Sequence, residues 1–376
     1  MKIIIDISQS VYTGTGVARF TINFAKALTN IRNINDHEIT FFFSSLNHKI
    51  PTEFLEIQKK NPNIKIQHLP IPPRALSYVW GNSTLRNLWP QMGDTYDLFV
   101  SSDWAEPPPK IAKYKSTIIH DLIFKRFPET VDPIILSAQT QRLENVTKET
   151  DIIFCDSEST LYDLKNYYPN TKGQVVVNYP GVDPLPSSNT DDLHFNSTFA
   201  SKKYFLSVGK LEPRKNIPLL VDAFTEFRKG INFSNFELVI VGPKGWDVSE
   251  NNLKRDGVHF LGAVTDIELE ALYRNALAFV YPTIYEGFGI PPLEAMLAGC
   301  PVIMSRSSSL VEIADENSAK YVAPNDKQDL IHAMQEMSNS DILRNKLIEN
   351  GLSNVKRFTW DKYVDKFISE ISKLKI

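Results

Sequence analysis

Short apolar runs of strand length alternate with segments whose apolar residues recur at helical spacing, and this alternation occurs twice along the chain. Residues 2–8 are the first such run, and Val17, Phe20, Phe24 and Leu28 follow on one side of a predicted helix. Because no all-β or all-α block interrupts the alternation, the pattern predicts an α/β protein. We expect two Rossmann-like, parallel-sheet domains that face each other across a cleft.

The same pattern places most other elements of the first half. The predicted strands after the first are residues 39–43, 97–100, 117–119, 151–157 and 174–178. The predicted helices after the first are residues 141–149 and 158–167. Residues 51–89 carry a mixed pattern in which we find no functional motif.

A second series of strands and helices begins at residue 204. The predicted strands are the run from 204, the run ending at 242, and residues 258–264, 279–281, 300–304 and 320–322. The predicted helices are the segment around 219–224, a short segment around 293–297, and residues 267–275, 307–314 and 326–337. The chain closes with an amphipathic segment in which Tyr363, Phe367 and Ile371 recur every four residues.

Chain length and local composition predict the domain boundaries. At 376 residues the chain is long enough for two domains of about 150 residues each. Residues 179–192 are rich in Pro, Ser and Asp, which is typical of a linker. The predicted division is an N-terminal domain at 1–180, a linker at 181–200, a C-terminal domain at 201–355 and a final helix at 356–376.

Composition disfavours several classes of partner. The formal net charge of −3 gives no general attraction to nucleic acid or to an anionic membrane. Cys155 and Cys300 each lie in an apolar run, so we expect buried thiols in a reducing cytoplasm. The start MKIIIDIS indicates a strand rather than a signal peptide, and no apolar run approaches the ~18–20 residues of a membrane helix. Peripheral contact with the inner face of the membrane stays open, and the sequence does not specify an oligomeric state.

The most informative stretch is residues 281–305, which predict a strand, a glycine loop, a short helix and another strand. Two glycines flank Phe288 in a loop that needs unusual backbone freedom, and the helix N-terminus after it suits an anion. Glu286 and Glu294 bracket the loop, and carboxylates accept hydrogen bonds from ligand hydroxyls. These features fit the diphosphate and hydroxyl groups of a nucleotide sugar. The alternative is a capped helix with two solvated glutamates.

A cluster of cations lies between the strand that begins at residue 204 and the helix that follows it. Lys210, Arg214 and Lys215 lie together in this loop. They make a diphosphate site plausible, since each charge-assisted contact contributes ~1.5–3 kcal/mol. A solvated turn is the alternative.

Two sites in the first half also carry candidate chemistry. Gly14 and Gly16 follow the first strand, but Arg19 occupies the third glycine position of the G-x-G-x-x-G fingerprint, which disfavours a dinucleotide oxidoreductase. His120 stands at the end of a predicted strand, where ligands bind in parallel sheets. The neighbouring Asp121 is expected either to orient His120 or to cap the following segment.

The sequence offers no pattern for a metal site. It contains no D-x-D triplet and no His/Cys/Glu cluster at metal-ligand spacing. We therefore predict that cationic side chains and helix N-termini neutralise a leaving diphosphate.

Three motifs carry a resemblance to a known family. The residues EGFGIPPLEAM, which contain Glu286 and Glu294, resemble the E-x7-E signature of retaining GT-B glycosyltransferases of family GT4. Residues 209–215 are similar to that family's G-R-x-x-x-x-K motif, although Lys210 stands in place of its arginine. The sequence IHDL followed by FPE resembles the subgroup that includes O-antigen mannosyltransferases. The resemblance spans nearly the whole chain and is strongest over residues 204–313.

The resemblance implies the fold and the roles of individual residues. It implies an acceptor-side N-terminal domain, a nucleotide-sugar-binding C-terminal domain, and a final helix that crosses back to the N-terminal domain. It implies catalytic roles for His120, Glu286 and Lys215. It implies donor-binding roles for Gly16, Asp121, Gly209, Lys210, Arg214, Lys215, Gly262, Val264, Gly287, Phe288, Gly289, Ile290 and Glu294. Glu286 and His120 would contact the donor sugar, Glu294 the ribose, and Lys215 the diphosphate together with either Lys210 or Arg214.

The resemblance also implies the reaction, which is hexosyl transfer with retention of anomeric configuration and without a metal or another cofactor. The donor is a GDP- or UDP-linked sugar used as substrate, with GDP-mannose favoured. The acceptor is a saccharide or lipid-linked saccharide in surface-polysaccharide synthesis. The alternatives are a nucleotide-sugar epimerase or phosphorylase of the same fold, or a non-catalytic binding subunit.

Overall fold

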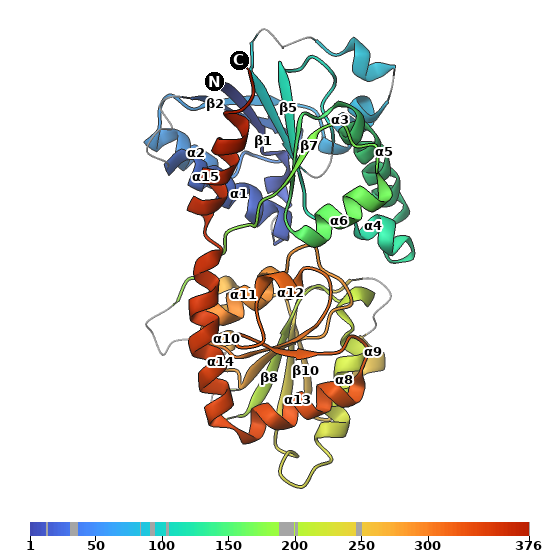
Figure 1. The fold of residues 1–376 in the computed structure, drawn as a ribbon, viewed down its shortest axis with the longest axis vertical. Helices are drawn as coiled ribbons and strands as arrows, with labels where there is room; N and C mark the ends of the chain where they lie inside the picture. The colour runs from blue at the N-terminus through green and yellow to red at the C-terminus, as the bar shows by residue number, and fades with distance from the viewer. Residues whose placement is uncertain are drawn as a thin grey trace. The chain divides into compact units, whose positions relative to one another are not determined.

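The computed structural model describes residues 1–376 apart from 13, 31–36, 83, 91–94, 103–104, 188–198, 200–201, 246–249 and 376. The chain divides into two compact units, each built around its own parallel sheet (Figure 1). Unit 1 comprises Met1–Gly181 and Trp360–Ile376, and unit 2 comprises Val182–Thr359. Most of the predicted linker at 181–200 lies outside the described residues.

The sheet of unit 1 has seven parallel strands in the order β3-β2-β1-β4-β5-β6-β7. These strands are β1 (Lys2–Asp6), β2 (Glu38–Ser44), β3 (Lys65–Leu69), β4 (Leu98–Ser102), β5 (Tyr114–Ile119), β6 (Ile152–Cys155) and β7 (Gln174–Val177). The order reverses at β1, which pairs with both β2 and β4. In such doubly wound sheets, ligands bind beyond the carboxyl ends of the strands near the reversal.

Helices cover both faces of this sheet. They are η1 (Ser8–Val11), α1 (Gly16–Asn30), α2 (Thr52–Lys60), α3 (Pro73–Gly81), η3 (Leu85–Leu88), α4 (Ile123–Arg126), η4 (Pro128–Thr130), α5 (Pro133–Glu149), α6 (Glu158–Tyr167) and α15 (Trp360–Ile371). Successive side chains of a strand point to opposite faces, so β1 contributes to two separate cores. Ile3 and Ile5 belong to the core that includes side chains of α1, α2 and α15, whereas Ile4 packs with Leu76 and Trp80 of α3.

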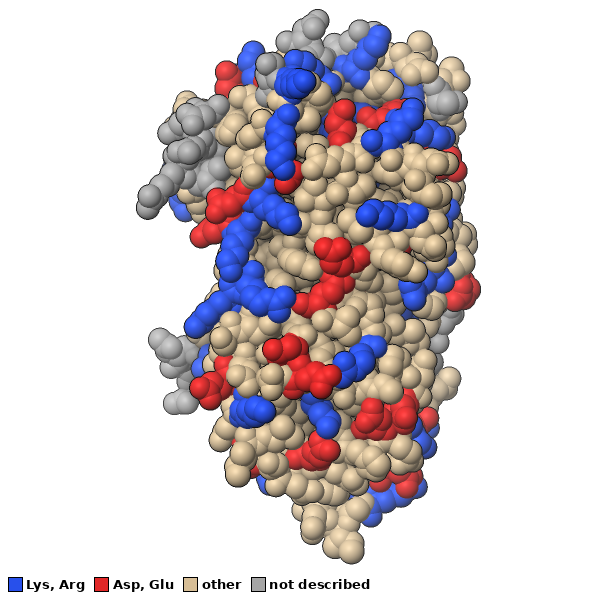
Figure 2. All heavy atoms as spheres, viewed as in Figure 1, with Lys and Arg blue, Asp and Glu red and all other residues tan. Residues whose placement is uncertain are grey.

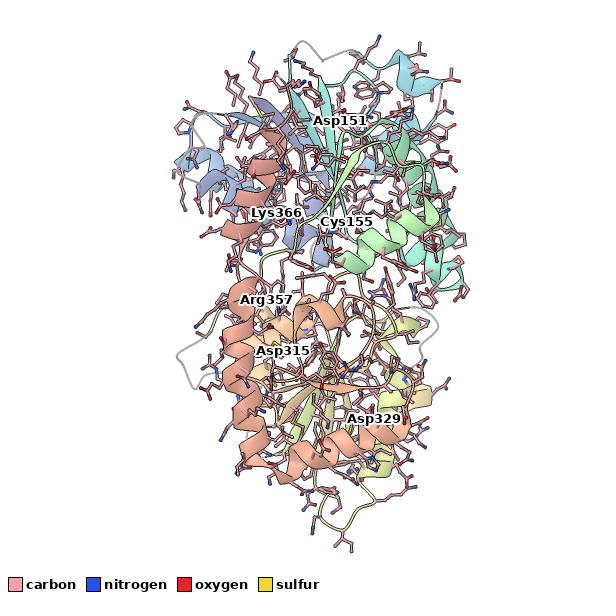
Figure 3. All side chains as sticks on the ribbon, in the orientation of Figure 1. Asp151, Cys155, Asp315, Asp329, Arg357 and Lys366 are labelled. Atoms are coloured by element: carbon pink, nitrogen blue, oxygen red, sulfur yellow. The ribbon has the colours of Figure 1, made fainter. Side chains whose placement is uncertain are left out.

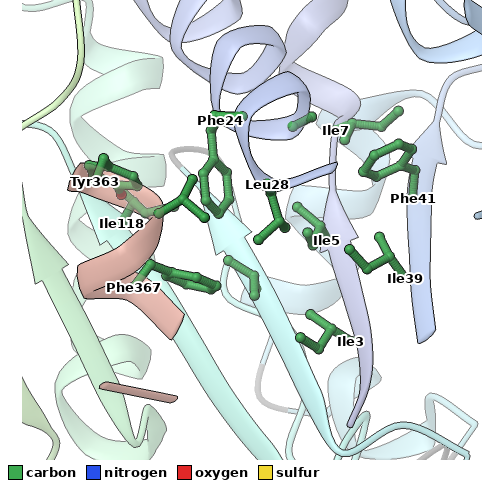
Figure 4. Packing of buried hydrophobic residues seen from close by; sticks show 14 of the residues in the cluster. Ile3, Ile5, Ile7, Phe24, Leu28, Ile39, Phe41, Ile118, Tyr363 and Phe367 are labelled. Atoms are coloured by element: carbon green, nitrogen blue, oxygen red, sulfur yellow. The ribbon is translucent and has the colours of Figure 1, made fainter. Parts of the chain in front are cut away.

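The final helix α15 belongs to the core of unit 1, although it follows unit 2 in the sequence. The ring centroids of Tyr363 and Phe367 lie 5.5 and 5.1 Å from that of Phe24 on α1 (Figure 4). The Asn178 side-chain amide donates a hydrogen bond of 3.0 Å to the carbonyl of Tyr363. The apolar side chains spaced every four residues are therefore buried here, and the predicted return of the last helix to the N-terminal unit is confirmed.

The sheet of unit 2 has six parallel strands in the order β10-β9-β8-β11-β12-β13. These strands are β8 (Tyr204–Val208), β9 (Glu237–Val241), β10 (Val258–Gly262), β11 (Ala278–Tyr281), β12 (Val302–Ser305) and β13 (Lys320–Val322). Its order reverses at β8, which pairs with β9 and β11. Unit 2 therefore repeats the doubly wound order of unit 1, as the alternation in the sequence predicts.

The helices of unit 2 pack around this second sheet. They are η5 (Pro213–Lys215), α8 (Ile217–Phe227), α9 (Glu250–Leu253), α10 (Asp266–Asn275), α11 (Ile290–Leu297), α12 (Leu310–Ile313), α13 (Lys327–Asn339), α14 (Asp341–Asn354) and η6 (Val355–Arg357). Leu220 and Phe224 of α8 and Met334 of α13 lie in one core with strand residues such as Phe205 and Val280. The apolar face predicted around residues 219–224 thus forms part of this core.

Unit 1 differs from the prediction in two places. Residues 51–89, where the pattern indicates no element, form α2, β3, α3 and η3. β3 is an edge strand whose side chains are only partly buried, so its apolar signal is weak. α5 begins at Pro133 rather than at residue 141. Pro133 suits a first helical turn, and Asp132 caps it by accepting a 2.8 Å hydrogen bond from the backbone N–H of Ile134.

The distribution of surface charge and the burial of the two cysteines agree with what the composition predicts. Charged side chains of both signs are interspersed on the face shown in Figure 2. Cys155, which Figure 3 labels, and Cys300 are both buried and form no disulfide. Within the described ranges, the structure holds no helix with the length and apolar character needed to span a bilayer.

Candidate functional site

The loops after β8 and β11 lie side by side at the reversal of the unit 2 sheet, because these two strands are hydrogen-bonded neighbours. The β8 loop carries the three predicted cations, and the β11 loop carries Glu286. The backbone N–H of Ile284 donates a 2.8 Å hydrogen bond to the carbonyl of Arg214, which joins the two loops. The sheet order therefore places these groups at the edge where ligands bind in parallel sheets.

Glu286 forms ion pairs with two of the predicted cations. Its Oε1 lies 2.6 Å from Nζ of Lys215, and its Oε2 lies 2.8 Å from Nη1 of Arg214. Only 9% of the Lys215 and Glu286 side chains is exposed. Arg214 also contacts a second carboxylate, since its Nε lies 3.0 Å from Oε2 of Glu212. The structure thus brings Glu286, Arg214 and Lys215 into one network in which each carboxylate oxygen holds one cation.

Tyr281, the last residue of β11, completes this network and was missed by the sequence analysis. Nζ of Lys215 donates a 2.6 Å hydrogen bond to the Tyr281 hydroxyl, which donates a 3.0 Å hydrogen bond to Oε1 of Glu286. The same Nζ lies 4.8 Å from the centroid of the Tyr281 ring. A buried tyrosine needs a partner for its hydroxyl, so its place before the glutamate loop was a usable signal.

The network sets the charge states of its members. Burial and, to a lesser extent, the neighbouring Arg214 lower the pKa of Lys215 to about 8, although Glu286 acts in the opposite direction. Burial acts to raise the pKa of Glu286, but Arg214 and Lys215 outweigh it and hold that pKa below its usual range. Burial raises the pKa of the Tyr281 hydroxyl well above its usual range. At neutral pH the site therefore holds a charged lysine, an ionised glutamate and a neutral tyrosine.

The substitution Tyr281→Phe tests the hydroxyl while it retains the ring beneath the lysine. We expect kcat/KM for the hexosyl transfer that the motifs imply to fall about fivefold, because one hydrogen bond to each of Lys215 and Glu286 is lost. Measurement of initial rates against donor concentration checks this. The exposed Tyr162, substituted in the same way, is the matched control and should leave the rates unchanged. An unaltered kcat/KM in the Tyr281 variant would show that the ring alone suffices.

Two glycines set the shape of these loops. Gly289 precedes α11 with a φ of 104°, and a Cβ there would lie 2.7 Å from Cδ2 of Leu310. Gly209 has a φ of 152°, and a Cβ there would lie 3.3 Å from Cε of Lys215. Both positions therefore favour glycine, because of left-handed backbone and close packing.

The β11 loop is hydrogen-bonded to two serine side chains in the segment between β12 and α12. The Ser309 hydroxyl contacts the carbonyls of Glu286 and Phe288 at 3.0 and 2.8 Å. The Ser308 hydroxyl accepts a 2.9 Å hydrogen bond from the backbone N–H of Glu286. These contacts fix the backbone on both sides of Gly287, which is itself buried.

Glu294 lies on α11, one turn after Ile290, the first residue of that helix. It is buried, and its Oε2 lies 3.4 Å from the hydroxyl of Tyr273. Burial raises the pKa of Tyr273 well above its usual range, so this hydroxyl donates to the carboxylate. The structure thus places Glu294 beside Tyr273, on the helix that follows the β11 loop.

The other donor-binding residues predicted in unit 2 are spread over separate positions. Lys210 has a side chain that is 43% exposed, and its Nζ lies 3.6 Å from Glu212. Gly262 ends β10, and its carbonyl accepts a 2.8 Å hydrogen bond from the backbone N–H of Gly242. Val264 follows it and is partly buried. Of the two candidates for the diphosphate arginine, Arg214 is the one that shares Glu286 with Lys215.

In unit 1, His120 follows the end of β5 and is paired with Asp156, which follows β6. Its Nδ1 lies 2.7 Å from Oδ2 of Asp156. Ile119 and Cys155 are register partners on these neighbouring strands, so the two next residues emerge at the same edge. The ring of Phe20 packs edge-on against His120, with the centroids 4.7 Å apart. No sequence motif marks Asp156, although the pairing of consecutive parallel strands was a signal for it.

Asp121 and Gly16 have local roles in the same unit. Oδ1 of Asp121 accepts a 3.0 Å hydrogen bond from the backbone N–H of Ile123 at the start of α4. This contact fits the predicted alternative in which Asp121 supports the following segment. Gly16 is exposed and is the first residue of α1, after the loop in which Gly14 has a φ of 81°.

The substitution Asp156→Asn tests whether this pair contributes to the reaction. A carboxylate fixes the tautomer and orientation of the imidazole, so we expect turnover to fall about tenfold or more when the charge is removed. Comparison of kcat for the variant and the wild type checks this, with circular dichroism as the test of folding. Asp163→Asn on neighbouring α6, which removes the ion pair to Arg126, is the control. An unchanged kcat in Asp156→Asn would assign the pair to stability alone.

The charged groups described here do not form a metal site. Within the part of the chain that the structure describes, no group of three or more His, Cys, Asp or Glu residues is placed to hold a metal ion. The cations of the β8 loop are suited to balance an anionic ligand.

Comparisons with known proteins agree with this arrangement. Residues 189–354 match the family model of glycosyl transferases group 1. The chain is 26% identical over 383 residues to the O-antigen chain mannosyltransferase B of Escherichia coli, with 96% of this chain and 97% of that protein covered. It is 37% identical over 232 residues to the O-antigen chain mannosyltransferase RfbU of Salmonella typhimurium, with 52% and 64% covered.

Solved structures share the fold over the whole chain. A sucrose-phosphate synthase of Thermosynechococcus elongatus has a TM-score of 0.70 at 19% identity, with 99% of this chain and 98% of that chain covered. The Anabaena protein HepE in complex with UDP-glucose has a TM-score of 0.68 at 16% identity, with all of both chains covered. The two doubly wound units and these matches define a glycosyltransferase of the GT-B fold class. The match of residues 189–354 to the glycosyl transferases group 1 family agrees with the GT4-like motifs that lie in this segment.

Proposed function

We propose that the chain transfers a hexosyl group, with mannose favoured, from a nucleotide sugar to a saccharide or lipid-linked saccharide during surface-polysaccharide synthesis. The observation that carries the proposal is the buried network of Arg214, Lys215 and Glu286 at the reversal of the unit 2 sheet. It combines two cations suited to a diphosphate with a carboxylate suited to sugar hydroxyls. The structurally similar HepE was crystallised in complex with UDP-glucose, which supports a nucleotide sugar as donor here.

In the proposed reaction, a hydroxyl oxygen of the acceptor attacks the anomeric carbon on the face from which the diphosphate departs. The bond from the anomeric carbon to the phosphate oxygen breaks, and its electron pair leaves with the nucleoside diphosphate. The proton of the acceptor hydroxyl passes to the departing phosphate oxygen, so no side chain is needed as nucleophile. Anomeric configuration is retained because attack and departure share one face.

Each side chain has a stated part in this proposal. Lys215 and Arg214 stabilise the negative charge that develops on the departing diphosphate, which is the electrostatic contribution expected to matter most. Glu286 holds both cations in position and accepts a hydrogen bond from the donor sugar. Glu294 accepts hydrogen bonds from the ribose, and His120, oriented by Asp156, contacts the donor sugar. No divalent metal takes part in this scheme.

The choice of mannose rests on the relatives. Two of them are named as O-antigen chain mannosyltransferases, and the first covers nearly the whole of this chain. We therefore place GDP-mannose first among donors and UDP-hexoses second.

Calorimetric titration of the protein with GDP, UDP, ADP and dTDP in the presence of EDTA tests the proposal. We expect one nucleotide to bind in the micromolar range without metal, because charge-assisted contacts to a diphosphate do not require one. Incubation with the matching nucleotide sugar should then release sugar and nucleoside diphosphate slowly when no acceptor is added. Binding of no nucleotide, or binding only after a divalent metal is added, would contradict the assignment of Lys215, Arg214 and Glu294.

A further inference from the structure

A cavity of about 650 Å³ lies between α3 and α5 in unit 1, and none of the candidate donor or catalytic residues lines it. This volume is within the range of ~300–1,000 Å³ that is usual for small-molecule sites. The two helices come close at Gly81, where a Cβ would lie 3.3 Å from Cγ of Gln141. The cavity is therefore shaped by the packing of two helices on one face of the sheet.

Neutral polar side chains line one side of the cavity, whose surface is otherwise largely apolar. Ser137, Gln141 and Asn145 line it from successive turns of α5. Tyr78 of α3 also lines it and is 69% exposed, which is unusual for so large an aromatic side chain. Amide and hydroxyl groups both donate and accept hydrogen bonds, and an aromatic ring offers a flat apolar face. This combination suits a sugar, which presents hydroxyls at its edge and C–H groups on its faces.

The two buried charged side chains of the cavity are both hydrogen-bonded within the protein. Glu106, which is 2% exposed, accepts hydrogen bonds from Ser101 and Thr150 and lies 3.1 Å from Nζ of Lys115. Arg142, which is 4% exposed, is bound to β5 through its Nη2. Arg74 of α3 also lines the cavity but is exposed, so water screens its charge, whereas an anionic ligand would be repelled by the buried carboxylate of Glu106.

The cavity is also linked to the strand that carries His120. Nη2 of Arg142 donates hydrogen bonds of 2.8 Å to Oγ1 of Thr117 and 2.9 Å to the carbonyl of Ile118. Ile118 precedes His120 by two residues, or about 7 Å along a strand that rises ~3.3 Å per residue. A ligand in the cavity would therefore be bound beside the strand that ends in a candidate catalytic residue.

We propose that this cavity binds sugar units of the saccharide acceptor, an inference that rests on the proposed function for the identity of that acceptor. Tyr78 stacks against a sugar ring, and Gln141 and Asn145 hydrogen-bond to its hydroxyls. The site thereby selects saccharide acceptors. The sugar units that it binds are not the unit that carries the reacting hydroxyl.

Binding of trisaccharides, observed by saturation-transfer NMR, tests the site without any need for catalysis. The probes are α-linked mannotriose, maltotriose and cellotriose, each offered to the wild type, Tyr78→Ala and Gln141→Leu. We expect at least one probe to bind the wild type and to bind each variant about tenfold more weakly, since each loses a stacking or hydrogen-bonding group. Tyr162→Ala on α6 is the matched control, because Tyr162 is 67% exposed and does not line the cavity.

The outcomes separate this inference from the proposed function. If no trisaccharide binds the wild type, or if the variants bind as tightly as the wild type, the cavity is not a saccharide site. If the wild type shows neither donor hydrolysis nor transfer, the proposed function fails. Even in that case, trisaccharide binding that is present in the wild type and lost in the variants would support a saccharide site. Where transfer to a bound trisaccharide is measured, we expect the KM for that acceptor to rise by the same factor of about ten in both variants.

Discussion

The substitution Glu286→Gln is expected to reduce turnover about 10²–10³-fold while the affinity for the free nucleoside diphosphate changes less than about tenfold. Glutamine keeps the size of the side chain but removes the charge that holds Lys215 and Arg214 at 2.6 and 2.8 Å. Both cations would then lose their fixed positions against the diphosphate, and the donor sugar would lose a charged hydrogen-bond acceptor. Free nucleotide lacks the sugar and undergoes no bond breaking, so its binding depends less on this carboxylate.

The same substitution is expected to lower stability, because two largely buried cations lose their shared counter-charge. The loss of one partner from a buried ion pair costs about 3–5 kcal/mol in the free energy of unfolding. Urea unfolding of the variant and the wild type measures this, while retained nucleotide binding shows that the variant is folded. Glu316→Gln is the matched control, since the Glu316–Arg306 pair is largely exposed. Turnover near that of the wild type in Glu286→Gln would contradict the assigned role.

The fold was largely predictable because the strongest signals in the sequence are the strands buried on both faces. Residues 3–5 and 238–241 are continuously apolar, and they lie in β1 and β9, which are inner strands of the two sheets. The edge strand β3 escaped prediction because one side of its backbone has no neighbour and its residues are half polar. The start of α5 was misplaced because residues 133–140 carry no clear apolar stripe, and the cap at Asp132 rather than periodicity sets the first turn.

Site residues that lie close together in the sequence could be predicted. Contacts between residues from distant segments were harder to predict. Glycines and charges within one loop, such as Gly209 and Lys215, could be interpreted directly from the sequence. The pairing of Glu286 with Lys215 joins positions in different loops, and it depends on β8 and β11 being neighbours in the sheet. The same holds for His120 and Asp156, whose contact follows from the register of β5 and β6. Strand order is a property of the whole fold, so a motif can identify a single residue of such a pair but does not show which residue it contacts.

The substitution Lys215→Met is expected to lower kcat/KM for the donor about 10²–10³-fold at pH 7 and to remove an alkaline decline in activity. In the wild type, burial lowers the pKa of Lys215 to about 8, so the ammonium needed for the diphosphate is lost as pH rises through that value. The wild-type kcat/KM should fall up to tenfold per pH unit above pH 8, since it reports the ionisation of the free enzyme. Initial rates between pH 7 and 9.5 measure both effects, and Lys229→Met at an exposed ion pair is the control.

Above pH 8, where kcat/KM is expected to fall, the contribution of Lys215 to the free energy of unfolding is expected to rise. The unfolded chain keeps the ordinary lysine pKa of 10.5, so between pH 8 and 10.5 it binds more protons at this position than the folded protein does. The free energy of unfolding contributed by Lys215 therefore rises with pH there, by up to ~1.4 kcal/mol per unit. This contribution should be absent from Lys215→Met, so the difference between the two unfolding curves isolates it. An identical pH dependence of stability in both proteins would show that Lys215 titrates at its ordinary value, and the decline in activity above pH 8 would then need another group.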